Sequence, residues 1–519
     1  MKKAIYLIIA LIGLSAPSCS DSMLDFSPTD SGSGKELLKS ASTAITSVNG
    51  IYRSMWTAGW STTANTHQCF GIAAYNLALD CMADDLIMQS QGNGWFWGDH
   101  CYNVKSNYTS SAFRSYDVWY ANYKWIANVN YIIDAEPEMA GTEADVAYVA
   151  GQAYAIRALC YLNLATWFSR APYNSLTGAS RWNEPCVPVY TTGTSIDTGG
   201  QPRESLRTVY GRIDQDIDRA IELLEKARET TLAENNKSHI NLYVALGIKS
   251  RACLAEGDWD GAFKAAKRVI DEGGYAVGTK SDLTGGMNSL DKQNVMWGAG
   301  IQVADQAGGY AGFFTHMDNK EGAHAKSAPK LISKQLYNRI SATDIRRDWW
   351  DPSDKESPYV SKKFSFANVA SFLGDYIYMR VEEMYFTAAE AALRLDDLKS
   401  ARELMNTVMA ERDPGYSANN RSGTLLGATT TTWTGSFLEN ILTHRRIELW
   451  GEYGRLFDVR RLGQGIDRRT DDGFSEECIS MMNRRNVNIT KADTYDWVLT
   501  IPKAELDANP NINEEDQNP

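Results

Sequence analysis

The chain has 519 residues, of which 43% are hydrophobic and 22% are charged, and its formal net charge is −12. This composition is typical of a globular protein and excludes a largely disordered one. The negative charge disfavours nucleic acid and anionic bilayers as main partners, because both are bound through basic patches.

The N-terminus has the pattern of a secretory signal peptide. Lys2 and Lys3 form a basic start, and an apolar run of eleven residues follows from Ala4 to Leu14. This run is far shorter than the ~20 residues that span a membrane as a helix. We predict that residues 1–18 are removed and that Cys19, which follows small residues, is the acylated first residue of a lipoprotein. An exported soluble protein with an incidental cysteine is the alternative.

The first half of the mature chain has the apolar spacing of long helices. Between residues 142 and 167, Val149, Ala153, Ile156 and Cys160 follow a period near 3.6 residues. Pro137 ends the helix before this segment, since proline breaks a helix interior. We predict helices over residues 35–56, 75–88, 117–135, 142–167 and 202–226.

An internal repeat follows. Residues 251–270 match residues 390–409 at a constant offset of 139, which pairs Asp258 with Asp397. Each copy is typical of a helix, a short turn around the aspartate and a second helix. Such hairpins resemble the tetratricopeptide unit, which buries its apolar face by stacking on neighbours. The sequence therefore predicts a mainly α fold, an α-solenoid of tetratricopeptide-like helix pairs with long, irregular loop insertions.

The main irregular region, residues 274–375, separates the two copies of the repeat. Within it, residues 294–303 have the pattern of a short strand. Loops of this length in a compact domain are usually functional. The tail, residues 502–519, is predicted to run extended over the surface.

The cysteines and histidines give no sign of a metal site or a disulfide framework. Apart from Cys19 there are seven cysteines spread over the chain, with no CxxC pair and no zinc spacing to the six histidines. Cys160 and Cys253 lie in apolar helical runs and are predicted to be small buried hydrophobes. One bridge among the others is possible.

Five segments, in order, carry a resemblance that spans nearly the whole mature chain. The chain resembles the SusD/RagB family, the surface glycan-binding lipoproteins of Bacteroidota. The segments are Cys19–Pro28, Gln152–Phe168 with Ala171-Pro172, Tyr378–Ala392, Arg445–Leu462, and the tail from Ile501 to Pro519.

The resemblance implies more than the residues show by themselves. It implies one domain over residues 19–519, with tetratricopeptide-like helices and a loop-rich insertion at about 274–375. It also implies an outer-membrane lipid anchor facing the cell exterior and a role in glycan capture. The implied partner is a SusC-like TonB-dependent transporter barrel, over which the lipoprotein sits like a lid.

The sequence contains no recognised catalytic motif. Asp84-Asp85 and Glu382-Glu383 are acidic pairs, but adjacent residues on a helix point in different directions, whereas a glycosidase needs carboxylates across a cleft. We predict that both pairs are solvated or salt-bridged helix faces. The charged segment 445–461 is predicted to be structural, with Arg445–Glu448 and Arg455–Asp458 bridging along one helix face.

Aromatic residues in Gly-rich loops are the candidates for binding. Trp and Tyr rings stack on the apolar face of a pyranose, and amide or carboxylate side chains meet its hydroxyls. Burial under the loops is the alternative for each ring, and Trp349-Trp350 is a weaker candidate. The predicted ligand-binding residues are Asn93, Trp95, Trp97, Asp99, Trp297, Gln306, Tyr310, Phe313 and Phe314.

The sequence therefore predicts a non-catalytic cell-surface lipoprotein that captures oligosaccharide or polysaccharide and delivers it to a transporter, with no cofactor or metal. Two alternatives stay open. One is a surface glycosidase, because glycosidase carboxylates carry little local signature. The other is a peptide-binding helical adaptor, since the same scaffold serves that role elsewhere.

Overall fold

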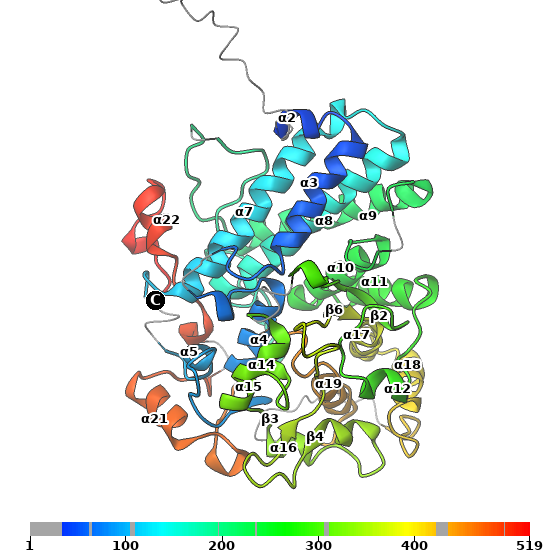
Figure 1. Ribbon diagram of the computed structural model, residues 1–519, viewed down its shortest axis with the longest axis vertical. Coiled ribbons are helices and arrows are strands. Elements are labelled where there is room, and N and C mark those ends of the chain that lie inside the picture. Colours follow the sequence, from blue (N-terminus) through cyan, green and yellow to red (C-terminus); the bar gives the residue numbers. More distant parts are fainter. Residues whose placement is uncertain are drawn as a thin grey trace, which may run out of the picture.

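The computed structural model describes residues 34–61, 65–103, 109–195, 197–233, 236–305, 311–421, 434–491 and 494–519. Helices dominate these residues, as the sequence predicts (Figure 1). The predicted signal peptide, Cys19, Gln306 and Tyr310 lie outside the described residues.

Long antiparallel helices build the first half of the chain. They are α3 (Ala41–Ser54), α7 (Phe113–Ala135), α8 (Glu143–Phe168) and α9 (Leu206–Lys226), and the short helix α2 (Gly34–Leu37) precedes α3. Helix α8 packs against α3, α7 and α9, and Figure 1 shows α3, α7 and α8 side by side. The side chains of Thr142 and Ser205 cap α8 and α9 by accepting hydrogen bonds from backbone N–H groups in the first turn.

The internal repeat forms two stacked helical hairpins. The first consists of α10 (Leu242–Glu256) and α11 (Trp259–Glu272), and the second of α17 (Val381–Arg394) and α18 (Leu398–Ala410). The repeated aspartates begin the second helix of each pair, because Asp258 and Asp397 accept hydrogen bonds from backbone N–H groups at 3.0 Å. Helix α11 packs on α17, and Ala262 and Ala391 share a buried cluster. The predicted solenoid is confirmed.

Two small antiparallel sheets lie in the rest of the chain. One has the order β1-β3-β5-β4, and the other pairs β2 with β6. The strand predicted within 294–303 is β2, whereas the helix predicted to reach Met88 ends at Met82 and β1 follows it. The strands are β1 (Leu86–Met88), β2 (Val295–Ala299), β3 (Lys330–Ile332), β4 (Trp350–Asp351), β5 (Val360–Ser361) and β6 (Tyr376–Arg380).

Shorter helices complete the loop-rich half, and most of them lie at the opposite end of the molecule from α2 (Figure 1). They are α4 (Ile72–Met82), α5 (Trp97–His100), α12 (Lys280–Thr284), α14 (Phe313–Met317), α15 (Ala323–Ser327), α16 (Lys334–Tyr337), α19 (Phe437–Glu448), α20 (Arg455–Arg461), α21 (Glu476–Arg484) and α22 (Lys503–Ala508). Eight 3-10 turns connect or extend the described helices; among them are η2 (Thr66–Gln68), η5 (Val303–Asp305) and η6 (Ile345–Trp349). Among the described residues, no helix is long and apolar enough to cross a membrane.

A buried network of charges joins the loop-rich half to the repeat helices. Glu448, at the end of α19, contacts Arg346, Arg380 and Arg412 at 2.9 to 3.0 Å. Burial alone would raise the pKa of Glu448, but the charges of these three arginines hold it well below its usual range. Glu452 accepts from Arg380 at 2.7 Å in the same network.

The charged helices are structural, as predicted, but their pairing differs from the prediction. Arg445 pairs with Asp458 at 2.8 Å and Glu448 with the three arginines, so the predicted Arg445–Glu448 bridge is wrong. Arg455 pairs with Asp84 at 3.1 Å. The partners of Arg445, Glu448 and Arg455 come from other segments, whereas Asp458 also pairs with Arg461 on its own helix at 2.7 Å.

The acidic pairs Asp84-Asp85 and Glu382-Glu383 are salt-bridged, but they are buried and not on exposed helix faces. Asp85 contacts Arg446 at 2.5 Å, and Glu383 contacts Arg251 at 2.7 Å. The seven described cysteines are free thiols and all are buried, which confirms the prediction that Cys160 and Cys253 are buried.

The tail docks on the first half of the chain and is less extended than predicted, since it contains α22. Asn518 donates to the carbonyl oxygens of Phe168 and Leu499 at 3.0 and 2.7 Å. The side chain of Arg203 donates to Asn518 at 2.9 Å.

Replacing Glu448 tests the charge network. We expect Glu448→Ala to lower the free energy of unfolding by about 3–5 kcal/mol, because it leaves three buried guanidinium groups without their shared carboxylate. The matched control is Glu403→Ala on α18, whose side chain is 65% exposed and 3.9 Å from Lys399. The denaturant midpoint measures both variants, and equal midpoints for the two would contradict a structural role of the network.

Candidate functional site

The loop that carries Trp95 folds back on itself, so that its rings point in different directions. Gly94 has a φ of 86° and Phe96 has a φ of 61°, and the backbone N–H of Phe96 donates to Gln68 at 2.9 Å. These left-handed turns bury Phe96 and leave Trp95 half-buried. Asn93 is exposed beside it.

Two histidines, His67 and His324, pack on Trp95, and with Asn93 and a third histidine, His316, they form the Trp95 corner. The Trp95 ring lies 5.1 Å from the ring of His67, tilted by 31°, and 6.0 Å from that of His324. His324 links the polar groups, because its Nε2 lies 2.8 Å from Nδ1 of His67 and its Nδ1 lies 3.1 Å from Nδ2 of Asn93. The ring of His316 stacks beneath His324 at 4.8 Å.

Burial keeps these imidazoles uncharged near neutral pH. It lowers the pKa of His67, and together with the charges of His67 and Lys330 it lowers that of His324 to about 4. The pKa of His316 lies well below its usual value, again mainly because of burial. The Trp95 corner is therefore polar but neutral, with one indole that keeps part of its surface exposed.

The structure corrects the expectation that the other predicted residues face solvent. Trp97, Trp297, Phe313 and Phe314 are each 8% exposed or less. They pack in the core because burying a large aromatic ring stabilises the fold more than leaving the ring exposed on a loop. Their ligand role stays a prediction, and no open ring face in the described structure supports it.

Asp99 and Trp297 have structural partners. Asp99 is fully buried and accepts hydrogen bonds from the Nε and Nη2 atoms of Arg114 at 3.0 and 2.9 Å. The indole N–H of Trp297 donates to the carbonyl oxygen of Ser238 at 3.1 Å. Trp349 and Trp350, the weaker candidates, are also buried.

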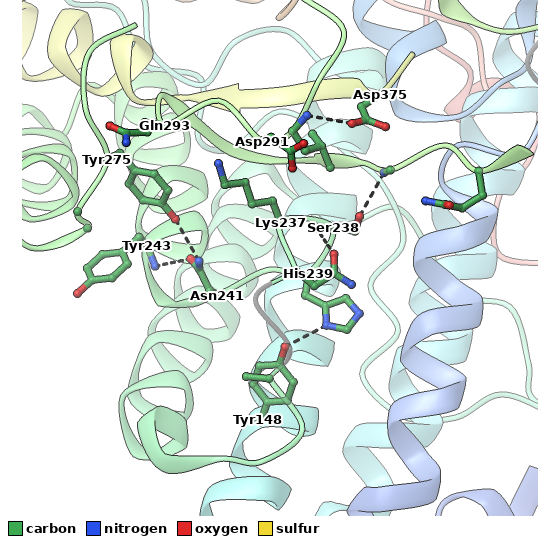
Figure 2. A pocket seen from close by; sticks show the side chains of 17 residues that line it. Tyr148, Lys237, Ser238, His239, Asn241, Tyr243, Tyr275, Asp291, Gln293 and Asp375 are labelled. Carbon is green, nitrogen blue, oxygen red and sulfur yellow. Dashed lines mark hydrogen bonds between the residues drawn. The ribbon is translucent and has the colours of Figure 1, made fainter. Parts of the chain in front are cut away.

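A polar cleft of about 1360 Å³, which the sequence did not indicate, lies between the repeat helices and strand β2 (Figure 2). Four segments line it: α8 at Tyr148, residues 236–243 at the start of α10, the turn 273–275 after α11, and the ends of β2 at 290–293 and 300–302. Ala233 and Asp375, which lies next to β6, complete the lining.

The inner end of the cleft is rigid. Nδ1 of His239 lies 3.0 Å from the hydroxyl of Tyr148, and Nε2 lies 2.7 Å from Oδ1 of Asn49. The ring of Tyr52 stacks on the imidazole at 5.1 Å. Because both ring nitrogens have partners, His239 is fixed in one orientation.

Two tyrosines form one wall of the cleft. The half-buried rings of Tyr243 and Tyr275 meet at 87° with centroids 6.3 Å apart. Asn241 holds this corner, since its Nδ2 donates to the hydroxyl of Tyr275 at 3.1 Å and its Oδ1 accepts from the backbone N–H of Tyr243 at 3.0 Å (Figure 2).

The opposite wall is fixed by backbone contacts. Both carboxylate oxygens of Asp375 accept backbone N–H groups, from Leu290 at 2.9 Å and Ile301 at 3.0 Å. The ammonium of Lys237 donates to the carbonyl oxygen of Lys292 at 2.5 Å. Gln293 is exposed on this side.

The fold defines the class of the protein, a helical-repeat scaffold of the tetratricopeptide type with a loop-rich insertion. Residues 319–519 match the model of the SusD family, and residues 44–254 match a model described as "Starch-binding associating with outer membrane". No curated protein matches the chain. The chain belongs to the SusD/RagB family, as its sequence motifs indicate.

Solved structures share the fold over nearly the whole chain. A SusD-like carbohydrate binding protein from Bacteroides vulgatus is 25% identical, with a TM-score of 0.73 over 92% of this chain and 98% of that one. A SusD superfamily protein from Bacteroides thetaiotaomicron is 22% identical, with a TM-score of 0.73 over 92% and 100%. Surface glycan-binding protein A from Bacteroides thetaiotaomicron, in complex with laminarihexaose, is 16% identical, with a TM-score of 0.65 over 92% and 99%.

The lowered pKa of His324 predicts a measurable effect of acid. Below about pH 6.5 the unfolded chain binds a proton that the folded protein does not accept at His324 until about pH 4, so stability falls as the pH falls through this interval. His324→Gln removes this titration and keeps a polar group beside Asn93. We expect its loss of stability between pH 6.5 and 4 to be smaller than that of the wild type by roughly 1–3 kcal/mol.

Urea denaturation at a series of pH values measures this difference. Other buried groups titrate in both proteins, so only the difference between the two curves reports His324. Parallel curves would show that His324 takes up its proton as easily in the folded protein as in the unfolded chain.

Proposed function

We propose that this protein is a non-catalytic, cell-surface glycan-binding lipoprotein. It captures oligosaccharide or polysaccharide and delivers it to a SusC-like TonB-dependent transporter in the outer membrane. The observation that carries the proposal is membership of the SusD/RagB family, supported by family models over residues 44–254 and 319–519. The solved relative in complex with laminarihexaose supports a carbohydrate as the class of ligand.

The Trp95 corner has the groups that a sugar requires. The indole offers an apolar face, and Asn93 offers both a donor and an acceptor for hydroxyl groups. A stacked sugar that hides ~100 Å² of apolar surface gains ~2.5 kcal/mol, whereas association costs several kcal/mol. One ring alone therefore binds weakly, and useful affinity needs further contacts along the glycan.

The acidic pairs do not favour the glycosidase alternative. Asp84 and Asp85 are occupied by Arg446 and Arg455, and Glu382 is occupied by Arg412 at 2.8 Å. A glycosidase needs two carboxyl groups facing the bond that is cleaved. Release of reducing ends from a glycan panel tests the alternative directly, and binding to peptide mixtures tests the adaptor alternative.

Replacing Trp95 tests the binding site. We expect Trp95→Ala to weaken binding to a retained polysaccharide at least about fivefold in affinity electrophoresis, because the stacking surface is lost. Trp95→Phe keeps a smaller ring, so its affinity should lie between those of the wild type and Trp95→Ala. The control is Trp182→Ala, which removes a half-buried indole that packs on Tyr210, away from the corner. If Trp95→Ala is retarded by the polysaccharide as strongly as the wild type, the binding site lies elsewhere.

Replacing Cys19 tests the lipid anchor. If Cys19 is acylated, Cys19→Ser prevents attachment of the lipid, and the protein moves from the membrane fraction to the soluble fraction of its native host. A lipid chain adds ~0.8 kcal/mol of membrane affinity per buried methylene, so its loss is decisive for partitioning. Ser20→Ala is the matched control. Membrane retention of the Cys19 variant would identify an exported protein held by other contacts.

A further inference from the structure

The polar cleft is separate from the Trp95 corner, since none of the residues that form that corner line it. We propose that it is a second carbohydrate-binding site, which takes an uncharged oligosaccharide; this inference rests on the proposed function. At about 1360 Å³ the cleft exceeds the roughly 300–1,000 Å³ of pockets that hold drug-sized ligands, so it has room for several linked sugar rings.

The tyrosine corner supplies the stacking surface. The rings of Tyr243 and Tyr275 stand nearly perpendicular, so they present two differently oriented apolar faces. Neither ring must move to bind, because Tyr243 lies in the first turn of α10 and the hydroxyl of Tyr275 is held by Asn241. Rigid aromatic faces with few free rotations lose little entropy when a ligand binds.

Polar groups around the tyrosines suit hydroxyl groups. Asn236, Asn241, Asp291 and Gln293 are exposed side chains with planar amide or carboxylate ends. Each can bind one hydroxyl as donor, acceptor or both. The wall that carries Asp291 and Gln293 is kept in place by the hydrogen bond between Lys237 and the carbonyl oxygen of Lys292.

The charges of the cleft favour an uncharged ligand. Among the described residues that line it there is one lysine and no arginine, and the ammonium of that lysine is bound to a backbone carbonyl. Asp291 and Asp375 add negative charge. A glycan that contains uronic acids would meet this charge without a guanidinium partner, so it should bind worse than a neutral one.

Trp297 has a supporting role in this arrangement. It is 1% exposed and lies in β2, and its indole N–H donates to the carbonyl oxygen of Ser238, which lines the cleft. The N–H of Gly300 donates to the hydroxyl of the same serine at 3.2 Å. The aromatic residue predicted to touch ligand thus fixes the segment that leads to the tyrosine corner.

The test uses the mature protein and a panel of polysaccharides in affinity electrophoresis. The neutral members are α-1,4-glucan, β-1,3-glucan, β-1,4-xylan and mannan, and the acidic member is polygalacturonate. Tyr243→Ala should bind the retained neutral polysaccharide at least about tenfold more weakly than the wild type, and Gln293→Ala should bind it about threefold more weakly. Tyr243→Phe keeps the ring and should bind within about twofold of the wild type.

The control is Tyr131→Ala on α7, which removes a tyrosine that is 45% exposed and lines neither site. Hydrogen exchange with and without the same polysaccharide gives a second readout, since backbone amides at 236–243 should become protected. This measurement does not depend on the folding of a variant.

The outcomes separate this inference from the proposed function. If the wild type is retained but Tyr243→Ala binds equally well and residues 236–243 show no added protection, the cleft is not a site, and glycan binding elsewhere stands. If polygalacturonate is the one polysaccharide that retains the wild type, the inference that the cleft takes an uncharged ligand is wrong. If no polysaccharide in the panel retains the wild type while peptide mixtures bind, the proposed function fails and this inference fails with it.

Discussion

The architecture depends on buried ion pairs centred on Glu448. Its carboxylate is shared by Arg346 before β4, Arg380 at the end of β6 and Arg412 after α18, three segments that lie far apart in the sequence. Each ion loses several kcal/mol of hydration on burial, so a structure that leaves one of them unpaired is strongly disfavoured. The network therefore restricts the loop-rich insertion to one position on the repeat helices, although that insertion has little regular structure of its own.

The charge network is connected through the backbone to both candidate sites, the cleft and the Trp95 corner. Arg380 ends β6, and β6 pairs with β2, whose flanking residues form one wall of the cleft. Arg446, two residues before Glu448, pairs with Asp85, the residue before β1, and the chain continues from β1 into the loop of Trp95. Buried ion pairs thus anchor the segments that lead to both candidate sites, so that loops with little regular structure can keep their side chains preorganised.

The sequence predicted those features that depend on interactions between residues close together in the chain. The 3.6-residue period of α8 and the repeated aspartates Asp258 and Asp397 act within a few residues of themselves, so helices and hairpins could be predicted from the sequence. The partners of Glu448 and the burial of Trp97 depend on segments distant in the chain, and no spacing encodes them. The tyrosine corner was missed for the same reason, because Tyr243 and Tyr275 meet only when α10 and α11 fold back on each other.

Two modest sites on one rigid frame suit a polymeric ligand. A single stacked ring gives little net affinity after the cost of association, and under the proposed function that weakness would let the protein release what it captures. A chain long enough to engage both the Trp95 corner and the cleft binds its second site at a high effective concentration, which can raise avidity by about 10²–10⁴ without any new contact. Short fragments lack this gain. Chain length would then decide retention, so the same protein could hold a polysaccharide at the surface and still give up the oligosaccharides cut from it.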